Sequence, residues 1–194
     1  MLENVLVQRN VKFKTKVTIK SLITFGLIVL AIGLPQLVHL VAGAQGGMTY
    51  LPMYLPVLIG GCLLGTWWGL GIGIASPIVS FFITFLAGSA MPTLERLPFM
   101  IVELAVFAFV AGLFSKKIAS NMWMAFPAVL FAQFAGRLSF LALVAIFQGV
   151  LSFNASMVWS QIQMGLIGIV LQALIVPCII MLLSYLLNRK KKND

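Results

Sequence analysis

The sequence is poor in the side chains that carry enzyme chemistry. Its 194 residues include four acidic residues, one histidine and two cysteines, and only 9% of the residues are charged. A typical soluble domain has about a quarter charged residues. No metal-ligand spacing surrounds the histidine or the cysteines, and no nucleophile stands beside a base. These absences argue against an enzyme, and we expect no catalytic residue, no metal site and no cofactor.

Nucleotide-binding signals are also missing. The Gly-x-Gly pairs at 69–73 lie in an apolar run and lack a following Lys-Ser or Lys-Thr, so they do not form a phosphate-binding loop. Cys62 and Cys178 lie in apolar runs as well, where cysteine is typically a small packing residue. An active process that involves this chain would therefore draw its energy from a partner.

Long apolar runs are what the sequence has instead. Hydrophobic residues make up 61% of the chain, and the mean hydropathy is +1.10. Runs of about 20 apolar residues cross a bilayer as helices, because lipid offers no partner for backbone amides. The sequence therefore predicts an all-α membrane protein, a six-transmembrane-helix bundle that forms one domain over 21–188. The predicted spans are 22–41, 50–64, 68–86, 97–114, 125–148 and 161–187.

Basic residues produce the formal net charge of +9, and they lie in clusters. All but Arg96 and Arg137 of the 13 lysines and arginines fall in the basic segment 1–20, at 116–117, or in the basic tail 189–194. Such clusters mark the cytoplasmic side of a membrane and contact anionic lipid. We therefore expect both termini to be cytoplasmic and no nucleic-acid partner. The outer loops are then 42–49, 87–96 and 149–160.

Two charged residues, Glu103 and Arg137, fall inside predicted spans. Charges within a membrane are costly, and they pair with each other or face a polar cavity. Counted from the outer ends of their spans, the two residues differ in depth by roughly 7 to 8 Å at 1.5 Å per residue, which an arginine side chain can bridge. Two compatible roles stay open: a pair that fixes helix register, or side chains that line a ligand cavity.

Further polar residues lie toward the outer half of the predicted bundle. Gln133 and Arg137 are one helical turn apart in a polar stripe that is expected to point inward. Arg96 is either half of a solvated ion pair or a cation at a cavity mouth, and His39 is either a hydrogen-bonded interface residue or a ligand contact. The candidate substrate-binding residues are Arg137, Gln133, Glu103, Arg96, His39, Tyr54, Asn154, Trp159 and Gln163.

Glycines recur at every fourth position from Gly61 to Gly73. This spacing places small residues on similar faces of a helix and lets a neighbouring backbone approach closely. The neighbour is either another helix of the bundle or a partner protein. The candidate packing or partner-docking residues are Gly61, Gly65, Gly69, Gly73, Gly26 and Ala31.

A pattern of glycine, proline and apolar residues follows the first predicted span. It consists of MYLPVLIGG at 53–61, LGTWWG at 64–69, Gly73 and Pro77, and it continues with FMIVELA at 99–105 and AGL at 111–113. Over about residues 20–188 the chain resembles the substrate-binding S components of energy-coupling factor (ECF) vitamin transporters. Its size, its six predicted spans, its predicted cytoplasmic termini and its lack of an ATPase motif fit the same family.

The resemblance implies a bacterial plasma-membrane protein that captures a water-soluble vitamin from outside, in a pocket roofed by the outer loops. It also implies docking onto a transmembrane T component that carries two cytoplasmic ATPases, with the S component toppling in the membrane to release the vitamin inside. The first span departs from the family, because it lacks an Ala-x-x-x-Ala docking face and has Gly26, Ala31 and Gly33 instead.

Several ligands are compatible with these residues. An arginine favours an anion such as pantothenate, and a wide pocket under the outer loops favours cobalamin. Stacking on Tyr54 or Trp159 favours a pyridoxine-like or pyrimidine ligand. Two other classes of function stay open, a stand-alone facilitator and a ligand-free membrane scaffold.

Overall fold

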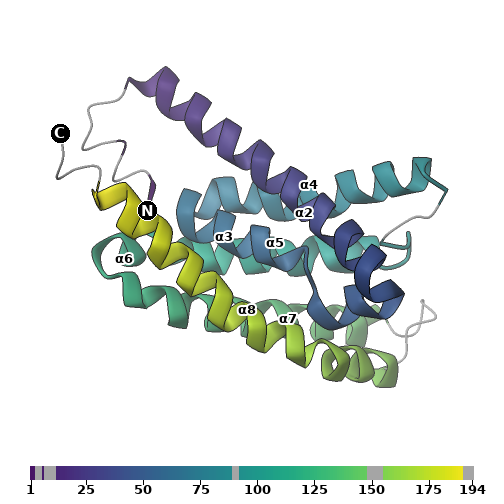
Figure 1. The fold of residues 1–194 in the computed structure, drawn as a ribbon. Helices are drawn as coiled ribbons and strands as arrows, with labels where there is room; N and C mark the ends of the chain where they lie inside the picture. The colour runs from purple at the N-terminus through teal and green to yellow at the C-terminus, as the bar shows by residue number, and fades with distance from the viewer. Residues whose placement is uncertain (3–5, 7–11, 89–91, 148–154, 190–194) are drawn as a thin grey trace.

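The computed structural model describes residues 1–2, 6, 12–88, 92–147 and 155–189. Over these ranges the regular structure is helical and no strand forms (Figure 1), which confirms the predicted all-α class. The helices are α2 (Phe13–Tyr50), α3 (Tyr54–Leu64), α4 (Thr66–Leu86), α5 (Leu97–Leu113), α6 (Ser115–Ser120), the 3₁₀ turn η1 (Met122–Met124), α7 (Ala125–Phe147) and α8 (Ala155–Arg189).

Four segments of the described helices are long and apolar enough to cross a membrane. They correspond to the first, third, fifth and sixth predicted spans. The second and fourth predicted spans also form helices, but α3 has 11 residues and α5 has 17. These lengths are about 16 and 25 Å, against a hydrocarbon core of about 30 Å. The four long segments are Phe13–Gly43, Thr66–Leu86, Met122–Phe147 and Gln163–Leu186.

The helices run in alternating directions along one axis (Figure 1). The start of α2, the short α6 and the end of α8 lie at one end of the bundle, and the α2–α3 junction and the start of α8 lie at the other. Helix α3 lies in the centre, where all its residues except Leu55 are buried and where it contacts α2, α4, α5, α7 and α8. Its sequence is apolar on every side, as expected of a helix that is surrounded by others.

Glycines bring α3, α4 and α5 into backbone contact. Gly65 connects α3 to α4 as a single residue with a φ of 88°, a conformation that favours glycine. A Cβ atom on Gly69 would stand 2.7 Å from the Cα atom of Gly61, and one on Gly73 would stand 2.5 Å from the carbonyl oxygen of Leu104. A methyl group does not fit at either place, so the close packing of these helices depends on glycine.

The end of the bundle that holds the α2–α3 junction is more helical than the sequence predicts. The expectation of a loop over 42–49 is wrong: α2 breaks at Gly43, where φ is 68°, and then continues to Tyr50. A glycine at positive φ redirects the chain, while the residues after it resume helical hydrogen bonds. The predicted loop 149–160 is also too long, because α8 begins at Ala155; residues 148–154 lie outside the described ranges.

Candidate functional site

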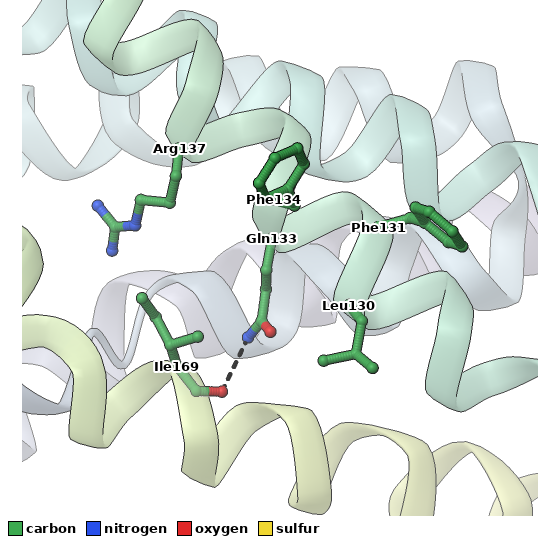
Figure 2. A pocket seen from close by; sticks show the side chains of 6 residues that line it. All are labelled: Leu130, Phe131, Gln133, Phe134, Arg137 and Ile169. Carbon is green, nitrogen blue, oxygen red and sulfur yellow. Dashed lines mark hydrogen bonds between the residues drawn. The ribbon is translucent and has the colours of Figure 1, made fainter.

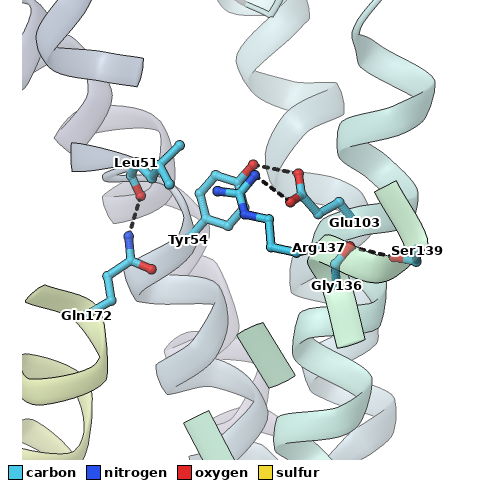
Figure 3. A network of polar contacts seen from close by, with 7 residues as sticks. All are labelled: Leu51, Tyr54, Glu103, Gly136, Arg137, Ser139 and Gln172. Atoms are coloured by element: carbon cyan, nitrogen blue, oxygen red, sulfur yellow. Dashed lines mark hydrogen bonds and ion pairs between the residues drawn. The ribbon is translucent and has the colours of Figure 1, made fainter. Parts of the chain in front are cut away.

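A polar cluster joins α3, α5 and α7 inside the bundle (Figure 3). The hydroxyl of Tyr54 donates to Glu103 Oε2 at 2.6 Å, and Arg137 Nη1 lies 2.9 Å from Glu103 Oε1. The guanidinium carbon lies 5.3 Å from the centre of the Tyr54 ring, within the range of a cation–π contact. Only 1% of the Glu103 side chain and 15% of the Arg137 side chain are exposed. The two charged residues therefore form a buried pair, and Tyr54 is its third member.

Phe107 and Gly136 hold the cluster in place. The Phe107 ring packs edge-on against Tyr54, with 5.1 Å between the ring centres and 82° between the ring planes. A Cβ atom on Gly136 would stand 2.7 Å from the Phe107 ring, so the lack of a side chain lets α7 lie directly against it. This close approach brings Arg137 on α7 within reach of Glu103 on α5.

The junction between α2 and α3 is held by α8. Leu51 has a φ of 49°, which is uncommon for leucine. Gln172 Nε2 donates to the carbonyl oxygens of Leu51 and Tyr50 at 2.8 and 3.2 Å. Gly165 and Gly168 provide the space, because a Cβ atom on either would stand within 3.0 Å of this junction. A helix end leaves backbone groups without partners, and Gln172 satisfies two of them.

Replacing Gln172 with leucine is expected to lower the free energy of unfolding by about 1–3 kcal/mol, since two carbonyl oxygens lose their donor. Thermal unfolding of the purified protein in detergent measures the effect. The matched control is Gln163→Leu, the same substitution at an exposed position of α8. Equal unfolding temperatures for the two variants would contradict a stabilising role of Gln172.

A cavity of about 540 Å³ lies between α7 and α8 (Figure 2). Three of its residues, Leu130, Phe131 and Phe134, are more than half exposed, so the cavity opens on the side of the bundle. Gln133 lies across it and donates from Nε2 to the carbonyl oxygen of Ile169 at 3.1 Å. The lining residues are Leu130, Phe131, Gln133, Phe134, Arg137 and Ile169.

Three buried polar atoms of the lining residues have no hydrogen-bond partner, namely Gln133 Oε1, Arg137 Nε and Arg137 Nη2. The Gln133 residue is only 3% exposed. Buried polar atoms without partners are rare in folded proteins, and each costs about 1–3 kcal/mol. Two donor nitrogens and one acceptor oxygen thus lie on adjacent turns of α7, beneath the apolar surface of the cavity.

The remaining substrate-binding candidates do not line this cavity. His39 is partly buried on α2, Arg96 directly precedes α5, and Trp159 and Gln163 are exposed on α8. Asn154 lies outside the described residues. The candidates that the structure brings together are Tyr54, Glu103, Gln133 and Arg137.

The predicted candidates omit three residues that shape the site, Gln172, Gly165 and Gly168. A signal for them is present in the sequence, because a glutamine lies one turn beyond a Gly-x-x-Gly pair in an apolar run. That signal says only that something packs against α8. The identity of the packed segment, the α2–α3 junction, comes from the structure.

The glycine and alanine candidates have different surroundings. Gly61, Gly69 and Gly73 pack against backbone of the same chain, and Ala31 is fully buried. These four residues therefore face the bundle and are not available to a partner protein. Gly26 has no atom within 4 Å of its Cβ position, so its face of α2 is open. The fifth glycine candidate, Gly65, forms the α3–α4 turn.

Within the described ranges no group of three or more His, Cys, Asp or Glu side chains gathers into a metal-binding arrangement. Comparison of the chain with protein-family models, with curated proteins and with solved structures gives no match.

Proposed function

We propose that the protein is the substrate-binding S component of an ECF-type transporter. It captures a water-soluble vitamin from outside the cell and delivers it inward with a T component and two ATPases. The observation that carries this proposal is the buried Glu103–Arg137 pair, whose guanidinium keeps unpartnered nitrogens beside a cavity. Charged residues within a membrane are costly and are typical of ligand or ion sites. The residue pattern that resembles this family supports the same function.

The proposed topology has six spans and two cytoplasmic termini in the plasma membrane. Helix α3 is short, but segment 43–53 extends its path toward the opposite end, and non-helical backbone is tolerated at membrane depth where protein buries it. The described basic residues of the three clusters lie at the start of α2, on α6 and at the end of α8, which share one end of the bundle: Lys12, Lys14, Lys16, Lys20, Lys116, Lys117 and Arg189. Trp67 at the start of α4 and Trp123 in the turn after α6 are both exposed, as tryptophans at a membrane interface are.

The α2–α3 junction is the proposed roof of the site. The position that a Cβ atom of Gly165 would occupy lies 3.0 Å from Leu51 Cδ1 and 3.6 Å from Arg137 Nη2. The Leu51 side chain and the guanidinium therefore meet at the same point on α8. Release of the two hydrogen bonds from Gln172 frees the junction to move and uncovers Arg137 for a ligand that arrives from outside.

The exposed face of α2, which points away from the other helices, is the proposed docking surface for the T component. Only 11% of its membrane-crossing window is buried, and the apolar side chains of Leu22, Phe25 and Val29 are more than half exposed. Gly26 lies among them without a contact, which leaves room for a close helix–helix approach.

A ligand-free membrane scaffold is the alternative function. The observation that favours it is the internal pairing of Tyr54, Glu103 and Arg137, since such a cluster also fixes the register of α3, α5 and α7. A scaffold has no use for the cavity or for the unpartnered nitrogens of Arg137, and we therefore place it second.

Mass spectrometry of small molecules that co-purify with the detergent-solubilised protein tests the proposal. We expect a near-stoichiometric vitamin, with pantothenate, cobalamin, pyridoxine-like and pyrimidine compounds as the first candidates. Uptake of that vitamin into cells is expected to require co-expressed T and ATPase subunits. Concentrative uptake by the chain alone would contradict the S-component function, and an empty protein that ignores a full vitamin panel would favour the scaffold.

A further inference from the structure

We infer that the ligand group bound by Arg137 and Gln133 is uncharged and planar, and that it carries a hydrogen-bond acceptor beside a donor. Amide, lactam and ureido groups have this form. The inference rests on the proposed function and specifies the class of ligand that the site takes. It differs from what the sequence alone favours, since an arginine in a predicted span points first to an anion.

The positive charge of Arg137 is balanced within the protein. Arg137 lies 2.9 Å from Glu103, whose side chain is only 1% exposed. The carboxylate of Glu103 therefore already neutralises the positive charge of the guanidinium. The other member of the cluster, Tyr54, donates its hydroxyl to the same carboxylate. Arg137 is the only charged residue among the six that line the described cavity. An anion bound here has no free positive charge to compensate the loss of its hydration.

The unpartnered atoms of Arg137 and Gln133 match a group that has both an acceptor and a donor. Arg137 Nε and Nη2 are donors, whereas Gln133 Oε1 is an acceptor whose own amide nitrogen is engaged by Ile169. All three atoms are buried in this structure, so binding requires the ends of the two side chains to turn toward the cavity. Residues four apart on a helix are neighbours, and one planar group can then bridge them. An amide satisfies them with its oxygen toward Arg137 and its N–H toward Gln133. A carboxylate has acceptors only and sets an oxygen against Gln133 Oε1.

The walls of the cavity are mostly apolar. Leu130, Phe131, Phe134 and Ile169 supply apolar and aromatic surface around the two polar side chains. A volume of about 540 Å³ lies within the usual range for small-molecule sites, roughly 300–1,000 Å³. The ligand therefore has an apolar or aromatic body with the neutral group at one end. A dissolved solute and a bilayer amphiphile share this chemistry.

Matched pairs of neutral and anionic compounds test the inference. The probes are nicotinamide and nicotinate, benzamide and benzoate, and phenylacetamide and phenylacetate, in which the anionic member has no other amide or ureido group; each is titrated into the purified protein in nanodiscs at pH 7. A neutral long-chain amide and the corresponding fatty acid, added within the nanodisc lipid, test the amphiphile as the source. In the pair that binds, we expect the neutral member to bind at least tenfold more tightly. Tighter binding of the anion, or no binding by any neutral member, overturns the inference.

Glu103→Gln provides a second test, in which the expected preference between the neutral and the anionic probe is reversed. The substituted amide can still bridge Tyr54 and Arg137, but the arginine loses its compensating charge. We expect the preference to invert, so that the anionic member of the pair binds at least tenfold more tightly than the neutral one. An unchanged preference for the neutral member in a folded variant would contradict the charge argument.

A second variant keeps the inference testable where Glu103→Gln fails to fold. Gln133→Leu removes the acceptor and is expected to weaken binding of the neutral probe about tenfold, with Gln163→Leu as the matched control on an exposed position. Equal affinities in these two variants overturn the inference. Preference for the anion together with uptake that requires the T and ATPase subunits leaves the proposed function intact. Preference for the neutral member with uptake that needs no partner refutes the proposed function alone.

Discussion

The Arg137→Met variant is expected to lose about 3–5 kcal/mol of stability, because the change leaves the Glu103 carboxylate buried without its partner. Methionine keeps the apolar length of the arginine side chain, so the loss reports mainly on charge. Ligand binding is expected to fall below detection in the same variant, since the two donor nitrogens beside the cavity are gone. Unfolding in detergent and ligand titration measure the two effects separately.

The double variant Glu103→Leu/Arg137→Met separates stability from binding. Replacing a whole buried ion pair with apolar residues of similar size is often neutral for stability, so we expect most of the stability to return. Binding is not expected to return with it. The control is Lys116→Met, which removes a positive charge from an exposed position of α6. A single Arg137→Met variant as stable as this control would show that the pair contributes nothing to the fold.

Gly73→Ala is expected to destabilise the bundle by about 1–3 kcal/mol, because overpacking forces the backbone apart. The added Cβ atom would stand 2.5 Å from the carbonyl oxygen of Leu104 and 3.0 Å from the backbone nitrogen of Ala105. Neither atom belongs to a side chain that can rotate away. The shift would also move α4 against the turn of α5 that carries Glu103, so ligand affinity is expected to fall as well.

Gly71→Ala is the matched control for this prediction. Gly71 lies two residues earlier on the same helix, and no atom lies within 4 Å of its Cβ position. Alanine is favoured over glycine in a helix interior by about 0.8–1.0 kcal/mol, so this variant is expected to be at least as stable as the natural protein. Thermal unfolding of both variants in one detergent gives the comparison, and equal unfolding temperatures would contradict the close contact at Gly73.

The sequence predicts the helical class and the approximate position of each long helix, because apolar runs and basic clusters are local features. It also narrows Glu103 and Arg137 to two compatible roles. Of these, the structure shows the buried pair, and it places Arg137 in the lining of a cavity. The sequence alone identifies Glu103 and Arg137 as candidates, because a charged residue in an apolar run is rare and can be recognised without knowing the fold.

The features that the sequence does not predict depend on contacts between distant segments. Gly43 looks like part of a flexible loop, but the chain is helical again after it, up to Tyr50. Gln172 contacts residues about 120 positions earlier in the chain, and no local pattern reveals such a pairing. Tyr54 was predicted as a stacking surface, whereas its hydroxyl hydrogen-bonds to Glu103; only the approach of α3 to α5 shows that role.

The Glu103–Arg137 pair also has an electrical consequence for the proposed delivery of a ligand across a membrane. Moving one elementary charge through the full potential requires about 2.3 kcal/mol per 100 mV. Two opposite charges 2.9 Å apart lie at nearly the same depth, so a motion that carries the cluster through the bilayer transfers almost no net charge. An uncharged ligand group adds none. The cluster would therefore add almost no voltage dependence to the proposed delivery step, although it holds two charges inside the bundle.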